Sequence, residues 1–568
     1  MLPLLVLAFA SACSQLVFLK PPSVPRKKGS SSTVRGPAFA AQSAQSAQSA
    51  QSTPRATGTG AADWPMYNRS YDGTRFSPLV QISAANAATL VPACTFPLGV
   101  KANLQTGLLA VDGTLYFTTL TDTYAVDAAT CALRWRHHYD FDPKPPFDPN
   151  KVNRGAAYLA GTDRARLFRG ANDGRVMALD AATGEELWSV VAGDPSAGET
   201  FPAAPIAWNG MVFMGNAGGD NFAVKGRRMA FDTKSGGRVW TFDLLPENGK
   251  AAQTWPPATE RFPKVGGASW TSYALDPATG VVYMPTGNAA PDFIAEFRPG
   301  QNLYSYSVVG LHTHEGTLDT FYQLLDHDYH DWDIAAAPSL ISTSAGQRLV
   351  IAAGKDGHLY GIDRVTGRQV YATPVSKIEN VDAPLTGKGA HFCPGVDGGV
   401  GWNGPAYSPR TNLLYVGSID WCTTIVTYLP SQPGKIRGKE ALPWTGSHKL
   451  RAPFGTNDST RSGWLTAVDA DDGSIKWRYA SPTPMIAGVT ATAGDVVFTG
   501  DLNGNVLAFD ARDGHELWRY AAGAPIGGGV ITYQVGGVEY LAVAVGMHSP
   551  VSWKLESPPA RVLVFKLR

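Results

Sequence analysis

Apolar and polar residues alternate on both sides of a short turn, and this arrangement recurs along most of the chain. The consensus reads Ala, apolar, Asp, two variable residues, Thr, Gly, three further residues and Trp. Alternation with a period of two predicts a β-strand on each side, and glycine can adopt the positive φ that a tight turn requires. Each copy therefore predicts a β-hairpin whose terminal Trp packs against a neighbouring unit. Clear copies are Ala125–Trp135, Ala178–Trp188, Ala230–Trp240, Ala467–Trp477 and Ala508–Trp518, and degraded copies are Gly310–Thr320 and Gly361–Tyr371.

Repeats spaced by about 40 to 60 residues are typical of a propeller or a solenoid. Two related segments, Ala274–Met284 and Ala406–Val416, lie where an inner hairpin would precede an outer one. Pairing them with the copies that follow gives seven blades. The region Trp64–Pro78 is then expected to pair with the C-terminal strands of Val530–Leu567, which makes an eighth blade and closes the ring. The sequence thus predicts an all-β, eight-bladed β-propeller, a count that shifts by one blade if the pairing does.

Composition agrees with a large β-fold. The chain has 568 residues, of which 44% are hydrophobic and 17% charged, with 61 glycines and 15 tryptophans. Such a chain can bury a sizeable core, and its many turns and aromatic residues favour strands over helices. The formal net charge is +1, so the charge balance does not indicate a nucleic-acid partner.

The N-terminal region differs in composition from the rest. Residues 1–19 carry no charge and contain the apolar run Leu2–Ala10, which indicates an export signal. The small residues before Cys13 resemble a lipoprotein cleavage box, with ordinary cleavage or an uncleaved anchor as alternatives. Residues 20–62 repeat Ala-Gln-Ser four times within Ala41–Ser52 and predict a flexible linker. We therefore expect an exported protein, periplasmic or an outer-membrane lipoprotein, with its propeller over residues 63–568.

Five cysteines are present. Apart from Cys13, an even number remains, which in an exported chain suggests two disulfides. The four remaining cysteines allow three pairings, and we prefer the pairing that closes the two shorter loops of the chain. The spacing Cys-x-x-Cys does not occur in the sequence, which argues against a zinc site and against covalent haem. The preferred pairs are Cys94–Cys131 and Cys393–Cys422.

Between the hairpins stand seven short motifs of polar and aromatic residues. Each is a weak signal alone, but their order along the chain is informative. They are Asp63-Trp64-Pro65 with Arg75–Pro78, Asn153-Arg154-Gly155, Gly218–Phe222 with Lys225-Gly226, Trp270 before Tyr273–Pro277, Thr286-Gly287-Asn288, His327-Asp328 with Asp331, and Lys355-Asp356-Gly357.

These motifs and the repeated Trp hairpin resemble the quinoprotein alcohol dehydrogenases, whose propellers carry tryptophan-docking repeats and bind pyrroloquinoline quinone (PQQ). The resemblance runs from about Asp63 to the C-terminus. It implies that Trp270 carries the flat quinone ring and that Arg154 and Lys355 bind its carboxylates and carbonyl oxygens. It also implies quinone contacts from Gln105 and Trp402.

The same resemblance implies a Ca²⁺ or lanthanide ion bound by hard oxygen ligands, which would polarise the reactive carbonyl. The implied ligands are Asp220, Asn221, Asn288, Asp331 and Asp333. Asp331 is also the implied catalytic base, which would accept the alcohol proton as hydride leaves for the quinone. Asp333 stands where the lanthanide-using members carry an extra aspartate.

Four positions depart from the family pattern. Asp148 and Pro149 replace the adjacent cysteines of many alcohol-oxidising members, Gln105 and Asn221 each replace a Glu, and His330 replaces the Trp before the catalytic Asp. The chain therefore resembles divergent members, such as those related to polyvinyl-alcohol dehydrogenase.

We expect oxidation of a small or polymeric alcohol, without a covalent haem. Electrons would leave to a separate acceptor, such as a cytochrome c or a membrane quinone. The alternative is a non-catalytic propeller lipoprotein that acts as a protein-interaction scaffold. A third hypothesis, a glycosidase that uses Asp328 and Asp331, has no supporting motif. The long segment Thr424–Ser462 is expected to form a cap or a partner-binding loop.

Overall fold

The computed structural model describes residues 60–140, 152–219, 224–257, 264–427, 445–446 and 455–568, together with the backbone of the strand β1 (Val34–Arg35). The predicted signal segment lies outside these residues, as does most of the predicted linker. In the described residues, no helix is both long and apolar enough to cross a lipid bilayer.

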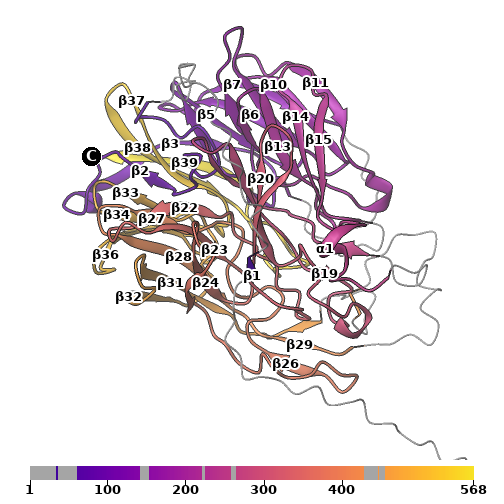
Figure 1. Ribbon diagram of the computed structural model, residues 1–568. Helices are drawn as coiled ribbons and strands as arrows, with labels where there is room; N and C mark the ends of the chain where they lie inside the picture. Colours follow the sequence, from indigo (N-terminus) through magenta and orange to yellow (C-terminus); the bar gives the residue numbers. More distant parts are fainter. Residues whose placement is uncertain are drawn as a thin grey trace, which may run out of the picture.

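Most strands belong to antiparallel sheets of four strands that follow one another along the chain (Figure 1). The first four sheets are β4 (Leu109–Val111), β5 (Thr114–Thr118), β6 (Asp122–Asp127) and β7 (Leu133–His138); β8 (Ala157–Leu159), β9 (Arg166–Gly170), β10 (Arg175–Asp180) and β11 (Glu186–Val191); β12 (Ile206–Trp208), β13 (Met211–Gly215), β14 (Arg227–Asp232) and β15 (Arg238–Asp243); and β17 (Ala274–Asp276), β18 (Val281–Pro285), β20 (Ser307–His312) and β21 (Leu318–Gln323), to which β1 is added.

The remaining four sheets have the same organisation. They are β22 (Ser339–Ser342), β23 (Arg348–Ala353), β24 (His358–Asp363) and β25 (Gln369–Pro374); β27 (Ala406–Ser408), β28 (Leu413–Asp420), β31 (Ser462–Asp469) and β32 (Ile475–Ser481); β33 (Thr490–Thr492), β34 (Val496–Gly500), β35 (Asn505–Asp510) and β36 (Glu516–Ala521), to which β2 (Phe76–Ser77) is added in parallel; and β37 (Val530–Val535), β38 (Val538–Val545) and β39 (Arg561–Leu567) with β3 (Leu90–Pro97).

Short elements occupy the connections. Two small sheets, β16 (Val265–Gly266) with β19 (Ala289–Ala290), and β26 (Ala390–Phe392) with β29 (Thr423–Ile425) and β30 (Thr456–Asn457), lie outside the four-stranded units. The short helices are η1 (Ala87–Thr89), η2 (Pro195–Ala197), α1 (Gly249–Ala252) and η3 (Ala295–Phe297).

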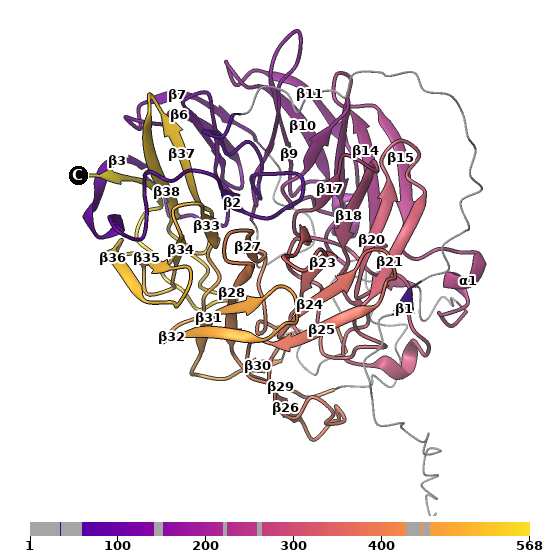
Figure 2. The same cartoon turned by 60° about the vertical axis from the view of Figure 1, so that its left-hand side comes forward.

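The hydrophobic core lies between neighbouring sheets. One cluster packs Leu109 and Tyr116 of the first sheet against Leu167 of the second. Equivalent clusters join each following pair of sheets. A further cluster joins the last sheet to the first, where Ile531 and Val562 pack with Leu115 and Phe117. Figure 2 shows the C-terminal strands, in yellow, beside the indigo strands of the N-terminal part. The predicted all-β propeller is confirmed, and over the described residues the last sheet packs back against the first, so the sheets form a closed ring.

Where the repeat keeps its Trp, the indole connects one sheet to the next, as for Trp135, Trp188, Trp240 and Trp477. Trp135 donates its indole N–H to the carbonyl of Ala181 at 3.1 Å, and Trp188 donates to Thr233 at 3.1 Å. The turn glycine of the following unit lies against the indole face: a Cβ on Gly184 would come within 2.5 Å of Trp135, and Gly184 has a φ of +76°. Glycine is therefore required both by the turn and by the approaching indole.

The prediction for ring closure was wrong in one detail. The strand that completes the C-terminal sheet is β3, which pairs with β39, whereas Trp64–Pro78 contributes only β2 and a bridge from Trp64 to Ala110. β3 contains two prolines, which argue against a strand within a sheet. Here β3 is an edge strand and its register shifts between Pro92 and Cys94, so both prolines are tolerated.

Both predicted disulfides are present. Cys94–Cys131 joins β3 to the turn after β6, so it links the last sheet to the first. Cys393–Cys422 joins the segments that follow β26 and precede β29. As expected, the segment Thr424–Ser462 interrupts one sheet, between β28 and β31; most of this segment lies outside the described residues.

Candidate functional site

Most residues singled out by the family motifs lie in loops, although they come from distant parts of the chain. Gln105, Arg154, Trp270 and Trp402 lie in the loops that lead into β4, β8, β17 and β27, the first strands of four sheets. Lys355 lies in the turn between β23 and β24. Because equivalent ends of propeller sheets converge on one face, such loops can bring residues separated by hundreds of positions together.

Two cations flank the indole of Trp270. The guanidinium of Arg154 lies 4.7 Å from the centre of the Trp270 ring and 5.2 Å from that of Trp402, and the ammonium of Lys355 lies 5.7 Å from the Trp270 ring. Arg154 donates to the side-chain oxygen of Gln105 at 2.9 Å and to the carbonyl of Trp270 at 3.1 Å. A flat aromatic surface beside two cations suits a planar anion.

Two carboxylates lie on the other side of Lys355. Its Nζ is 3.2 Å from Asp331 and 2.8 Å from Asp333. Asp333 also accepts the indole N–H of Trp270 at 3.1 Å and the backbone N–H of Asn288 at 2.9 Å. A Cβ on Gly287 would come within 2.6 Å of Asp333, so the glycine of the Thr-Gly-Asn motif makes room for this carboxylate. Asp333 therefore ties the expected ring platform to the expected metal ligands.

The donor set around Lys355 fits a hard cation. Asp331 and Asp333 supply two carboxylates, and both pair with Lys355. The amide nitrogen of Asn288 donates to Asp292, which leaves the amide oxygen of Asn288 for a cation. Oxygen donors of this kind are the ligands that Ca²⁺ and lanthanide ions prefer. The other expected ligands, Asp220 and Asn221, lie outside the described residues.

Asp328 organises the loop that presents Asp331. Its carboxylate accepts the backbone N–H groups of His330 at 3.0 Å and Trp332 at 3.1 Å, and its other oxygen lies 2.8 Å from Nδ1 of His330. Burial raises the pKa of Asp328, but the hydrogen bond and charge of His330 and the two backbone donors outweigh it, so the pKa is lowered overall. Asp331 itself adopts a φ of +66°.

This arrangement accounts for His330, which the family pattern did not. The His330 ring stacks on Trp332 with centres 4.1 Å apart and meets the edge of Phe392. Because the Asp328 carboxylate is used by its own loop, the geometry gives no support to a glycosidase pair of Asp328 and Asp331. The organising role of Asp328 was missed from the sequence, although the Asp-x-His spacing was visible.

A wall of aromatic residues continues from Trp402. Its indole donates to the carbonyl of Gly527 at 2.9 Å, and its ring meets Trp553 edge to face at 5.8 Å. Trp553 in turn lies 5.5 Å from Trp421. Neither Trp421 nor Trp553 was identified from the sequence, because no motif or repeat marks them.

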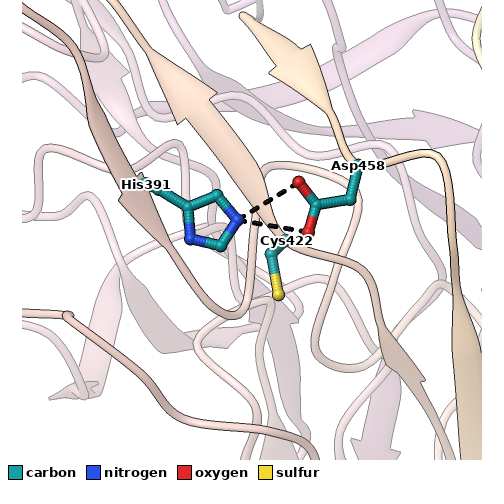
Figure 3. Close-up of side chains that lie close together, drawn as sticks. All are labelled: His391, Cys422 and Asp458. Carbon is teal, nitrogen blue, oxygen red and sulfur yellow. Dashed lines mark hydrogen bonds and ion pairs between the residues drawn. The ribbon is translucent and has the colours of Figure 1, made fainter.

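A second group of metal-type side chains lies next to Trp421, whose indole N–H donates to the carbonyl of Asp458 at 2.8 Å. His391, Asp458 and Cys422 are close together, with Nε2 of His391 3.1 Å from both Asp458 oxygens (Figure 3). Cys422 is bonded to Cys393, so its sulfur is not a thiolate. Since metals bind cysteine as the thiolate, the group is an ion pair between β26 and the residue after β30.

Comparisons with known proteins agree with this geometry. A family profile for the "Glucose/ethanol/alcohol dehydrogenase, beta-propeller domain" that carries the name PQQ matches residues 64–385, more than half of the chain. A profile for the outer membrane protein assembly factor BamB matches the shorter stretch 461–544.

Similar proteins cover nearly the whole described chain. The dehydrogenase subunit of an alcohol dehydrogenase (quinone) from Gluconacetobacter polyoxogenes is 30% identical over 543 residues, 85% of this chain and 71% of that protein. Methanol dehydrogenase [cytochrome c] subunit 1 from Methylobacterium organophilum is 28% identical over 85% of this chain and 84% of its own.

Solved structures give the same result. The quinohemoprotein alcohol dehydrogenase of Comamonas testosteroni superposes with a TM-score of 0.78 at 26% identity, over 89% of this chain and 80% of that one. A europium-containing methanol dehydrogenase has the same TM-score and identity, over 89% of this chain and 98% of that one. The chain is therefore a member of the PQQ-dependent alcohol dehydrogenase family, a family of quinoprotein oxidoreductases.

Proposed function

We propose that this protein oxidises an alcohol-type substrate with PQQ and passes the electrons to a separate acceptor. The observation that carries the proposal is one connected cluster: Arg154 and Lys355 flank the ring of Trp270, and Lys355 and Trp270 both contact the Asp333 carboxylate. A scaffold propeller has no need of buried charges that converge on one indole.

The chain's own groups account for quinone binding. Arg154 and Lys355 offer charged N–H donors to carboxylate and carbonyl oxygens, and Trp270 offers a ring face. Gln105 orients Arg154 by accepting one of its N–H groups at 2.9 Å. Trp402 closes the apolar side near Arg154. When bound, PQQ and its metal ion supply the hydride acceptor and a Lewis acid.

Asp331 is the proposed general base. It is buried, with 5% of its side chain exposed, and it lies beside Lys355. The loop built on Asp328 fixes its position. Removal of the hydroxyl proton by a positioned carboxylate typically accelerates such a step about 10²–10⁴-fold. Asn288 and Asp333 are the proposed partners of Asp331 in binding Ca²⁺ or a lanthanide ion, together with Asp220 and Asn221.

The surroundings of the reaction are also part of the proposal. The similar methanol dehydrogenase is named for cytochrome c, and the sequence has no Cys-x-x-Cys-His for a haem of its own. Both points support an external cytochrome c or a membrane quinone as acceptor. Export by residues 1–19, a linker over 20–62, a periplasmic location and a lipid on Cys13 are proposed from the sequence.

Reconstitution tests the proposal. Protein free of cofactor would be mixed with PQQ and either Ca²⁺ or La³⁺, and alcohol-dependent reduction of an artificial electron-accepting dye would be followed. We expect activity only when quinone and metal are both present, and strongly reduced activity for Arg154→Met. A protein that binds PQQ but oxidises no alcohol with either metal would contradict the proposal.

A further inference from the structure

A second polar cluster lies beside the aromatic wall, and none of the family motifs includes it. It consists of Asp397, Asn457 and Arg461. Asn457 donates its amide N–H to Asp397 at 2.8 Å. The guanidinium of Arg461 lies 4.6 Å from the ring centre of Trp421 and 5.9 Å from that of Trp553, and it donates to the carbonyl of Trp553.

This cluster adjoins the proposed reaction centre. The backbone two residues after Asp397 is pressed against Lys355: a Cβ on Gly399 would lie 2.2 Å from the Lys355 carbonyl oxygen. Burial raises the pKa of the Asp397 carboxyl, against the opposing effects of Lys355, Asn457 and Arg461. The aromatic wall of Trp402 and Trp553 connects Arg461 to the other side of the centre.

Both charged groups have hydrogen-bonding capacity to spare. Within the described part of the chain, Asn457 is the only hydrogen-bond partner of the Asp397 carboxylate, which can accept about four hydrogen bonds. Over the same residues, Arg461 uses one of its five donors, toward Trp553. Asp397 and Arg461 are both partly exposed. The cluster thus offers acceptors and donors side by side at an apolar surface.

The charges select the ligand chemistry. A carboxylate on the ligand would be attracted by Arg461 but repelled by Asp397, and an amine would be repelled by Arg461 and Lys355. A hydroxyl group can use both residues, because it donates to Asp397 and accepts from Arg461. A neutral ligand with several hydroxyl groups therefore fits best.

We propose that Asp397 and Arg461 bind a second hydroxyl group of the substrate, so that the preferred substrates are small diols and polyols. The inference rests on the proposed function, because it places the reacting hydroxyl at Asp331. A site that hydrogen-bonds a substrate hydroxyl discriminates against the analogue that lacks it, since its polar groups are then left unpaired.

The test compares 1,3-propanediol with 1-propanol in the protein loaded with quinone and metal. We expect kcat/KM to be higher for the diol by about 10- to 100-fold, the effect of one charge-assisted hydrogen bond. Asp397→Asn and Arg461→Met should each reduce this ratio at least about tenfold. Asp458→Asn is the matched control: it removes a charge next to Asn457, but this carboxylate faces His391, so the ratio should not change.

Equal rates for the two alcohols in the unmodified protein, or an unchanged ratio in both variants, would overturn the inference. If the loaded protein oxidises neither alcohol, the proposed function has failed, and binding decides the inference by itself. Saturation-transfer NMR with glycerol should then show binding that Arg461→Met abolishes and Asp458→Asn preserves. Absence of glycerol binding would overturn it.

Discussion

Replacing Lys355 with Met removes the ammonium group that pairs with both Asp331 and Asp333. Breaking a buried ion pair by removing one partner costs about 3–5 kcal/mol. The Lys355 side chain keeps 16% of its surface exposed, and Asp333 keeps its N–H donors from Trp270 and Asn288. Because of this exposure and these remaining donors, we expect a loss slightly below that range, about 2–3 kcal/mol.

Calorimetry of the protein without cofactor measures this loss. Unfolding entropy of about 2 cal/mol/K per residue, over roughly 500 ordered residues, converts each kcal/mol into about 1 °C. Lys355→Met should thus unfold about 2–3 °C earlier. Ca²⁺ should recover the loss, because the ion replaces the missing charge; at a hundred times its dissociation constant it stabilises by about 2.7 kcal/mol.

The same reasoning predicts tighter binding of Ca²⁺ to Lys355→Met than to the unmodified protein, since the ion no longer competes with the ammonium. Lys377→Met is the control, because Lys377 pairs with Glu379 where both side chains are 49% exposed, and surface pairs contribute little. Equal calcium affinity in Lys355→Met and the unmodified protein would refute a metal site at Asp331 and Asp333.

Three further predictions concern the ring of Trp270, the disulfide between Cys94 and Cys131, and the buried carboxyl of Glu539. Trp270→Ala should weaken PQQ binding, while Trp270→Phe should retain part of it; unchanged affinity in a spectroscopic titration would misplace the ring. Cys94→Ser with Cys131→Ser should lower stability by up to about 4 kcal/mol, the chain-entropy value for a separation of 37 residues, seen as an earlier thermal midpoint. Burial raises the pKa of Glu539 to about 7, so ionisation of this carboxyl lowers the stability of the protein as the pH rises from about 4.5 to 7. Glu539→Gln should therefore stabilise the protein at pH 8 by up to about 3 kcal/mol but not at pH 4. Equal effects at both pH values would contradict the raised pKa of Glu539.

The repeat could be predicted from the sequence because its physical cause is local. Trp135 meets Gly184, and the same contact recurs between Trp188 and Gly236, Trp240 and Gly316, and Trp477 and Gly514. The pattern of one hairpin therefore already contains the surface that the next hairpin covers. The closing strand β3 could not be found in this way. Its prolines disfavour a strand, and they are tolerated only because β3 lies at the edge of its sheet, a position that depends on the tertiary structure.

Some residues of the candidate site could likewise be predicted from local motifs, and others could not. Arg154, Trp270 and Lys355 were identified because they stand in motifs, and the structure brings them together. Asp397 and Arg461 stand in no motif. The charge of Lys355 lowers the pKa of Asp397, and Arg461 lies against Trp421 and Trp553, and no spacing along the chain reveals either relation. Contacts between side chains from distant loops depend on the tertiary structure, so they could not be predicted from the sequence.

The most informative experiment follows the reduction of bound quinone by alcohol in a single turnover, without oxygen or an external acceptor. Protein loaded with PQQ and Ca²⁺ would be mixed with 1,3-propanediol, and the absorption of the oxidised quinone would be followed in a stopped-flow instrument. We expect stoichiometric reduction by the unmodified protein, because the bound quinone is the proposed hydride acceptor. Asp331→Asn should bind the quinone yet reduce it about 10²–10⁴-fold more slowly. Reduction at the same rate in Asp331→Asn, or no reduction of bound quinone in the unmodified protein, would contradict the proposed function.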